Sequence, residues 1–183
     1  MRQYTIAIVV GSLRQDSFNR AVAQAVARLA PADFTCEEVS IAALPLYNQD
    51  ADGHEEEAVR QFRQEIAASD AVLFATPEYN RSIPGVLKNA LDQGSRPWGK
   101  SVWAGKPAAV IGVSPGGMGT ALAQQHLKSV LSFLNMPTLC QPEVYLQFKE
   151  GLLDKNGNIG EASKGFLQGF VDTFAAWVRR NLA

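Results

Sequence analysis

The chain has 183 residues, of which 46% are hydrophobic and 19% charged, the balance of an ordinary globular protein. This length predicts a single domain over residues 1–183, with enough chain to bury a core and to cover both faces of a sheet. The 17 basic and 18 acidic residues give a formal charge of −1, which disfavours binding to nucleic acid or to an anionic membrane. The composition therefore favours a small or neutral partner.

The beginning of the chain and its cysteines indicate a cellular compartment. Met1 to Gln3 lead directly into a short strand pattern, without the apolar region or the cleavage site of a signal peptide. Cys36 and Cys140 lie far apart and lack CxxC spacing, so we expect no disulfide, zinc site or redox pair. We interpret both cysteines as core residues and the protein as cytoplasmic.

The first half of the chain alternates strand and helix patterns. Residues 4–10 are predicted as a buried strand, followed by a helix that ends at Pro31. Residues 34–39 alternate as a second strand, and a long loop with Leu44 to Asn48 follows. From Glu55 a second helix is predicted, with Glu55, Glu56 and Glu57 in its first turn, where the helix dipole favours them.

The second half continues this alternation. Residues 71–75 and 107–113 are predicted as buried strands, and between them Pro84 is placed to open a helix that a long loop over 94–105 follows. A further helix is predicted on the apolar face of Ala123, Leu127, Val130, Leu131 and Leu134. Thr138 to Cys140 and Val144 to Leu146 suggest a fifth strand interrupted at Pro142. The last helix carries a core stripe of Phe166, Phe170, Phe174 and Trp177.

This alternation predicts an α/β fold with a mostly parallel sheet and helices on both faces. Ligands of such sheets bind beyond the carboxyl ends of the strands, where the strand order reverses. The loops after the first, third and fourth predicted strands meet at that edge, and they are the loops richest in Gly, Pro, Ser and Asn. The sequence therefore places a binding site there before it identifies the ligand.

The first of these loops, Val10 to Asn19, has the residues of an anion site. Gly11 allows a tight turn off the strand, and Ser12, Ser17 and Asn19 supply short hydrogen-bonding side chains. Arg14 adds a guanidinium suited to phosphate, and the N-terminus of the next helix presents free N–H groups to the same place. An ordinary strand-to-helix loop capped by Ser is the alternative interpretation.

Several other motifs are incomplete. No second glycine follows Gly11 in its turn, which disfavours a dinucleotide fingerprint. Residues 94–101 match GxxxxGK[ST], but they follow a helix and lead into a strand, the reverse of a P-loop. Residues 154–165 lack the glycine and the glutamate of a calcium loop. His54 and His126 have no partner that suggests catalysis, so we assign them structural or solvent roles, with no metal site and no catalytic side chain.

A monophosphate site, a rigid Pro-Glu-Tyr-Asn loop and a Gly-rich third loop together suit FMN. The residues Gly11-Ser12-Leu13-Arg14, Ser17-Phe18-Asn19 and Pro77-Glu78-Tyr79-Asn80, with Ser82 and the stretch Pro84 to Asp92, resemble those of the NADPH-dependent FMN reductase family. The similarity runs over about the whole chain. Gln93 follows Asp92 where the family often has Trp, and the loops over 94–103 and 114–119 are individual.

The resemblance implies a flavodoxin-like doubly wound fold with a five-stranded parallel sheet. It also implies these FMN-binding residues: Ser12, Arg14, Ser17, Phe18, Asn19, Pro77, Glu78, Tyr79, Asn80, Ser82, Ser114, Gly116 and Gly117. Members of the family are commonly homodimers or homotetramers, and residues 44–48 resemble a loop that contributes near a subunit boundary.

The implied activity is that of an FMN-dependent NAD(P)H oxidoreductase. In this scheme NADPH or NADH passes hydride to the bound flavin, and the electrons then go to a small acceptor: a quinone, free flavin, an azo compound or chromate. The alternative is a flavodoxin-type electron carrier without NAD(P)H activity of its own. Carriers that exchange electrons with proteins tend to be strongly charged, and the balanced composition here is weak evidence against that role.

Overall fold

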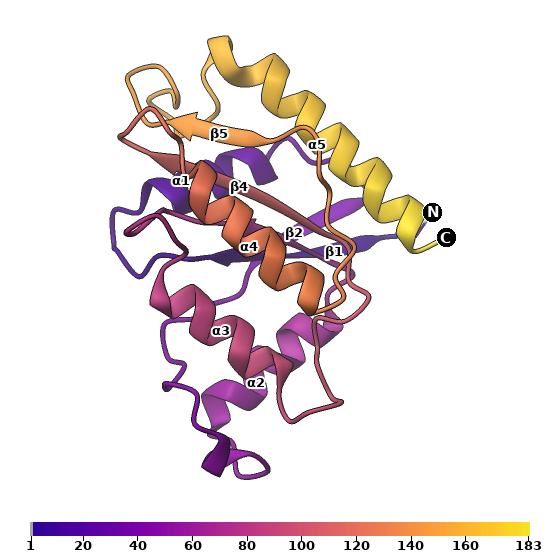
Figure 1. Ribbon diagram of the computed structural model, residues 1–183. Helices are drawn as coiled ribbons and strands as arrows, with labels where there is room; N and C mark the ends of the chain where they lie inside the picture. The colour runs from indigo at the N-terminus through magenta and orange to yellow at the C-terminus, as the bar shows by residue number, and fades with distance from the viewer. Residues whose placement is uncertain (1) are drawn as a thin grey trace.

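The computed structural model describes residues 2–183, and it has one parallel sheet between two layers of helices (Figure 1). The strands are β1 (Tyr4–Val10), β2 (Phe34–Glu38), β3 (Ala71–Ala75), β4 (Ala108–Ser114) and β5 (Val144–Gln147). The helices are α1 (Phe18–Ala27), α2 (Glu57–Ala68), α3 (Gly85–Ser95), α4 (Ala121–Phe133) and α5 (Glu161–Asn181), with a short 3-10 helix, η1 (Gln49–Ala51).

The five strands have the order β2-β1-β3-β4-β5, and all neighbours are parallel. This is the strand order of the flavodoxin-like fold, so the predicted fold class is confirmed. The chain starts near the middle of the sheet, moves outward to β2 and then crosses back to β3. The order therefore reverses between β1 and β3, directly below the loops that follow those strands.

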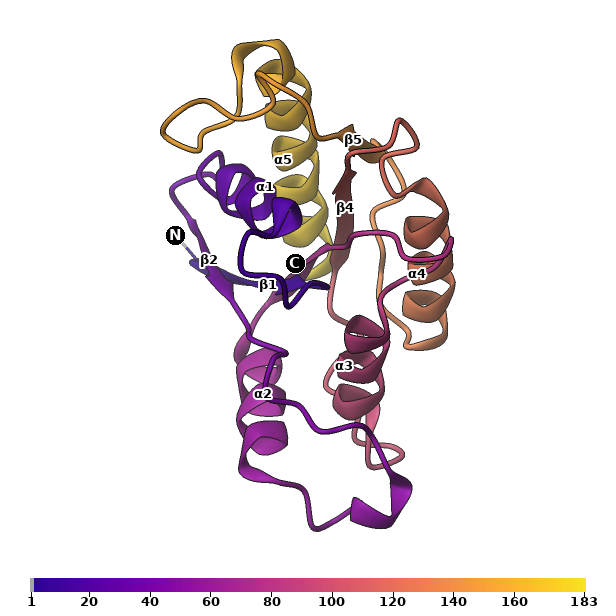
Figure 2. The same ribbon diagram turned by 90° about the vertical axis from the view of Figure 1, so that its left-hand side faces the viewer.

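Alternate side chains of the central strands pack against different helix layers, because successive residues of a strand face opposite sides. Ile6, Ile8 and Leu73 face α1 and α5, whereas Ala7, Val9 and Phe74 face α2, α3 and α4. Both faces of β1, β3 and β4 are buried, which explains their continuous apolar runs. Figure 2 shows the two helix layers on either side of the sheet.

Some elements differ from their predictions at the ends. Helix α2 begins at Glu57 with Glu56 as its N-cap, so only Glu57 lies in the first turn. The fifth strand is Val144–Gln147 alone, and Thr138 makes only an isolated bridge to Ala108. Pro142, which has no N–H to donate to a strand ladder, lies between the two segments.

Three predicted core residues are less buried than expected. Phe166 is 48% exposed, and Leu167 occupies the buried face of α5 in its place. Cys36 is only half-buried, while Cys140 is exposed. The interpretation of both cysteines as core residues was therefore wrong for Cys140, because its neighbour Leu139 occupies the buried position of this segment.

None of the helices described within residues 2–183 is both long and apolar enough to span a bilayer. That part of the chain also contains no group of three or more His, Cys, Asp or Glu side chains placed to hold a metal ion.

Candidate functional site

The three Gly-, Pro- and Ser-rich loops meet at the carboxyl edge of the sheet, as the sequence predicts. They are the first loop (residues 11–17, after β1), the second loop (residues 76–84, after β3) and the third loop (residues 115–120, after β4). Figure 2 looks onto this edge and shows the loops between the starts of α1, α3 and α4.

The first loop carries hydrogen-bond donors that the protein itself does not use. The Ser12 and Ser17 side chains are buried, and their hydroxyl oxygens accept from the N–H groups of Arg14 and Arg20 at 3.4 and 3.3 Å. Within residues 2–183, neither hydroxyl has an acceptor for its own proton, and the N–H groups of Phe18 and Asn19 bind no protein oxygen. This set of donors at a helix N-terminus suits a phosphate dianion.

Arg20 fixes the shape of this loop, a role that the sequence interpretation missed. Its guanidinium donates to the carbonyl oxygens of Ser12 at 3.2 Å and Arg14 at 3.0 Å, and its Nε donates to Glu38 at 2.8 Å. Two loop carbonyls are thereby engaged by one cation. The position of this arginine, two residues after the start of α1, could have suggested a role at the loop, but its partners could not be assigned without the fold.

Arg14 lies on the aromatic ring of Phe18, with its guanidinium carbon 4.9 Å from the ring centroid. Phe18 in turn stacks on Phe148 at 3.8 Å between centroids. Arg14 is exposed and has no carboxylate partner within residues 2–183. The stacked pair thus supports an arginine whose charge is free for an anion at the loop.

The side chain of Asn19, which was predicted to lie at the phosphate, is engaged within the protein. It is buried, donating to the Val113 carbonyl at 2.9 Å and accepting from the Val113 N–H at 3.0 Å. These paired bonds imitate a strand neighbour and join the start of α1 to the end of β4. The structure therefore uses Asn19 as scaffold, and its side chain is not among the free donors.

The second loop contains a tight turn of Tyr79, Asn80, Arg81 and Ser82. Tyr79 and Ser82 exchange two backbone hydrogen bonds of 3.0 Å, and Asn80 and Arg81 have positive φ values of 52° and 65°. A left-handed conformation costs a non-glycine residue about 1 kcal/mol or more, and Asn tolerates it better than Arg. Strain of this kind is concentrated at functional sites.

The other predicted residues of the second loop are fastened to the protein. The Glu78 carboxylate accepts the Ala123 N–H at 3.0 Å, so it binds the first turn of α4, where the helix dipole favours an anion. Pro77 is half-buried and its carbonyl accepts the Thr76 hydroxyl at 2.8 Å. Tyr79 is 55% exposed, which leaves its ring available to a flat ligand.

The third loop offers backbone in place of side chains. Ser114 donates its hydroxyl to the Gly116 carbonyl at 3.0 Å, while the N–H groups of Gly116 and Gly117 bind no acceptor within residues 2–183. A Cβ on Gly117 would meet nothing within 4 Å, and one on Gly116 would meet only the Ser114 hydroxyl at 3.8 Å. Packing within the protein therefore leaves room for a side chain at both positions. A ligand that approached the backbone closely would explain why glycine is present.

The stretch Pro84 to Asp92 serves to hold another segment in place. Asn89 accepts the Tyr47 N–H and donates to the Pro45 carbonyl, both at 2.8 Å, and Gln93 donates to the same carbonyl at 3.0 Å. Asp92 pairs with Lys88 one turn earlier at 2.8 Å. Residues 45–47 are thus held along α3, and Gln93 takes part in this contact.

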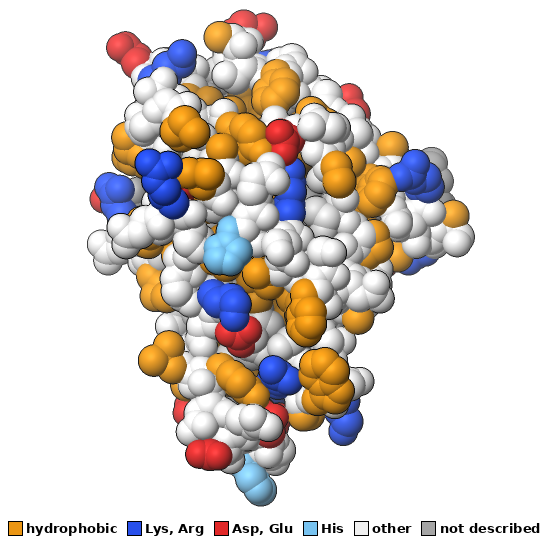
Figure 3. Space-filling model, in the orientation of Figure 1, with side chains coloured by type: hydrophobic (Ala, Val, Ile, Leu, Met, Phe, Trp, Pro, Cys, Tyr) orange, Lys and Arg blue, Asp and Glu red, His pale blue; other side chains and the backbone are white. Residues whose placement is uncertain are grey.

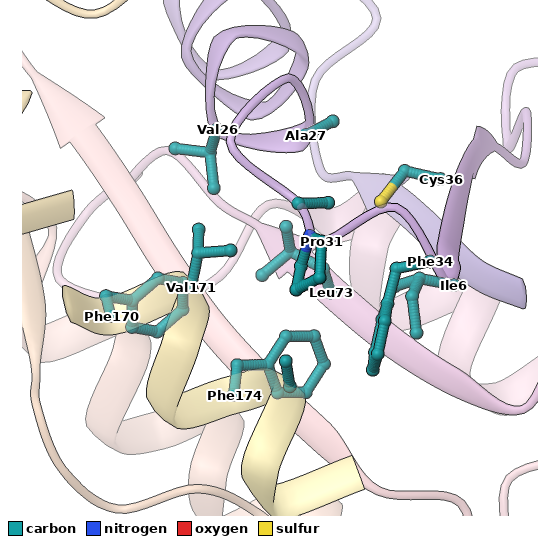
Figure 4. Close-up of a pocket in the computed structure, with 12 residues that line it drawn as sticks. Ile6, Val26, Ala27, Pro31, Phe34, Cys36, Leu73, Phe170, Val171 and Phe174 are labelled. Carbon is teal, nitrogen blue, oxygen red and sulfur yellow. The ribbon is translucent and has the colours of Figure 1, made fainter. Parts of the chain in front are cut away.

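A small apolar cavity lies elsewhere, between α1, β2 and α5 (Figure 4). Side chains including Val26, Phe34, Phe170 and Phe174 point into it, with the Cys36 thiol at its wall. Its volume of about 20 Å³ holds at most a water molecule, and its lining is apolar. A flavin cannot bind in this cavity.

Comparison with known proteins gives a consistent result. A model of the family described as NADPH-dependent FMN reductase matches residues 4–151. A 2-hydroxy-1,4-benzoquinone reductase from Burkholderia sp is 56% identical over 175 residues, which is 95% of this chain and 96% of that protein. A quinone reductase from Pseudomonas putida is 50% identical over 181 residues, covering 98% and 97% of the two chains.

Among solved structures, the flavoenzyme NAD(P)H:(acceptor) oxidoreductase FerB from Paracoccus denitrificans superposes with a TM-score of 0.93 at 43% identity. The match covers 97% of this chain and 98% of that chain. The predicted resemblance is therefore confirmed, and the chain belongs to the NADPH-dependent FMN reductase family.

Proposed function

We propose that this chain is an FMN-dependent NAD(P)H oxidoreductase whose acceptors are quinones. The observation that carries the proposal is the set of unused donors at the carboxyl edge: the Ser12 and Ser17 hydroxyls, and the N–H groups of Gly116 and Gly117. They fit a phosphate at one end of the edge and a carbonyl-bearing ring at the other. Family membership and the quinone reductase names of two close relatives support the same function.

The residues divide between the two ends of the ligand. Ser12, Ser17 and Arg14 would hold the FMN phosphate, with Arg20 keeping the loop in shape. Pro77, Tyr79 and Asn80 would lie along the ring from one side, and the third loop from the other. The N–H groups of Gly116 and Gly117 are fixed dipoles that would stabilise negative charge on the ring. Bound FMN supplies hydride transfer between a nicotinamide and an acceptor.

This function needs no nucleophilic side chain. The protein has to bind the flavin, orient it and leave one face open to solvent, and the exposed positions of Tyr79, Gly116 and Gly117 leave that room. The acceptor class of quinones rests on the relatives' names, and free flavin, azo compounds and chromate belong to the same proposal as small acceptors.

We also propose a cytoplasmic homodimer or homotetramer. The face made by α3, α4 and the loop after α3 carries hydrophobic side chains at its surface (Figure 3). Trp98 and Phe133 are each 77% exposed and border a groove of about 370 Å³, and Leu46 is 85% exposed. Exposed apolar patches of this kind favour association between copies.

The visible spectrum of the purified protein tests the function. We expect flavin absorbance, present at once or after addition of FMN, that bleaches when NADPH or NADH is added without oxygen and returns when a quinone is added. Flavin that binds but stays oxidised with both nicotinamides would indicate an electron carrier instead. Failure to bind FMN would refute the site.

A further inference from the structure

The strained turn Tyr79 to Ser82 is fastened at both ends to one helix. At its start, the Glu78 carboxylate accepts the Ala123 N–H of α4. At its end, the Ser82 hydroxyl lies 2.7 Å from Nδ1 of His126, one turn further along α4. His126 is thus a histidine with a specific partner on the second loop, although its sequence context gave it only a structural or solvent role.

The two fastenings differ in kind. The Glu78 contact uses a backbone N–H that every residue at position 123 except proline would provide, so the helix itself supplies it. The Ser82 contact depends on a single side chain, because His126 is the only partner of the Ser82 hydroxyl within residues 2–183. The geometry at the carboxyl end of the turn therefore depends on the identity of residue 126.

We propose that His126 is a positioning residue for the flavin site and acts through Ser82. The proposal rests on the proposed function, because the turn it holds is the one expected along the ring. Asn80 and Arg81 are both left-handed, and their N–H groups have no acceptor within residues 2–183. The hydrogen bond between His126 and Ser82 holds the N–H groups of Asn80 and Arg81 in one orientation. Without this bond, the turn relaxes toward conformations with negative φ, which non-glycine residues prefer.

Substitutions at position 126 separate positioning from other roles. Asn places an amide atom where His has Nδ1, so H126N keeps a partner for Ser82, whereas H126Q reaches past it and H126A offers none. We expect FMN to bind about fivefold more weakly to H126A and H126Q than to the wild type, by flavin fluorescence quenching, and nearly normally to H126N. His54→Ala, a change at an exposed histidine beyond η1, is the matched control.

A second pair of variants tests the route through Ser82. S82A should weaken FMN binding as much as H126A, and the double variant should be no weaker than either, because both changes remove the same hydrogen bond. Additive losses, or normal binding in H126A, would overturn the proposal. Equal losses in H126A and H126N would also overturn it, since they would show that the ring is needed for something other than the bond to Ser82.

A measurement without flavin keeps this inference separate from the proposed function. In the flavin-free protein, amide hydrogen exchange at Tyr79 and Ser82 should be several-fold faster in H126A than in the wild type and restored in H126N. Urea unfolding should show full folding of all variants, since His126 is exposed. If exchange in H126A equalled that of the wild type, the proposed role of the Ser82–His126 hydrogen bond would be refuted. If exchange changed as expected but the wild type did not bind FMN, only the proposed function would be refuted.

Discussion

The two edges of the sheet use their polar residues in opposite ways. At the amino edge, acidic residues just before two strands have ion-pair partners: Asp70 pairs with Arg2 at 2.9 Å, and Asp33 pairs with Arg179 in the last turn of α5 at 2.8 Å. Lys106 donates to the carbonyl oxygens of Ala67 and Ser69 at the end of α2. At the carboxyl edge, hydroxyl and N–H donors have no acceptor among residues 2–183, and two successive non-glycine residues are strained.

This difference separates residues that stabilise the fold from residues kept for a ligand. At the amino edge, the polar groups have hydrogen-bond or ion-pair partners within the protein, so they contribute to folding and need no ligand. Unsatisfied donors at the other edge are hydrated until an anion or a carbonyl replaces the water. The carboxyl edge nevertheless contains scaffold residues of its own, and the following substitutions distinguish the two classes.

The largest effect is expected from Gly112→Ala in β4. A Cβ at this position would lie 1.9 Å from the Thr120 hydroxyl oxygen and 2.6 Å from the Thr76 carbonyl oxygen. Because backbone would have to move, we expect the free energy of unfolding to fall by about 3 kcal/mol, measured by urea denaturation. Gly117→Ala is the control: it should leave stability unchanged and weaken FMN binding. If both variants lost stability alike, the glycines of the third loop would be structural.

A slightly smaller effect is expected from Asn19→Ala. The change leaves the Val113 N–H and carbonyl without their paired partner at a buried position, so stability should fall by about 2 kcal/mol. Gln24→Ala, on an exposed turn of the same helix, should change it little. An Asn19 variant that is stable but binds FMN poorly would return this residue to the ligand-binding class.

Arg14→Ala should affect binding without affecting folding. A charge-assisted hydrogen bond to phosphate is worth about 1.5–3 kcal/mol, so FMN affinity should fall by roughly 10- to 150-fold. The unfolding midpoint should not move, because Arg14 is exposed and has no ion-pair partner within residues 2–183. Arg180→Ala at the amino edge provides the matched loss of one charge. Unaltered FMN affinity would mean that the phosphate lies elsewhere.

The smallest effect is expected from Asp33→Asn. The hydrogen bond from Arg179 is the main reason that the pKa of the Asp33 carboxyl is lowered from its ordinary value of 3.8. The stabilisation is therefore present above pH 3.8 and is lost as the pH falls through the lower folded pKa. We expect a small destabilisation near neutral pH that disappears in acid, by urea denaturation at several pH values, and no change in FMN binding. A change in binding would contradict the separation of the two edges.

The sequence predicted those features of the fold that depend on local pattern. Long apolar runs identified β1, β3 and β4 because both of their faces are buried, and the rule for parallel sheets then brought the three loops to one edge. The uncertain segments were at the borders of the sheet, where burial is one-sided. In α5, the predicted apolar stripe included Phe166, which lies outside the face of the helix that is buried against the rest of the protein. The spacing of apolar residues alone cannot show where this buried face ends.

Long-range partners could not be predicted in this way. Asn19 binds Val113 across 94 positions, and Ser82 binds His126 across 44. Arg20 engages the loop that precedes it, although a basic residue near a helix start has no unique partner in sequence. Side-chain type suggested chemistry at these positions, but only the fold shows which groups are already occupied and which remain free.

The unequal cysteines give the molecule two internal chemical probes. Cys140 lies at the surface, so a thiol reagent should label it at once, while Cys36 stands at the wall of the small apolar cavity under α5, where burial raises the pKa of its thiol. Cys36 is half-buried and its thiol pKa is raised, so we expect it to react more slowly than Cys140. The ratio of the two labelling rates would report how far the wall of this cavity is open to solvent, without any engineered cysteine.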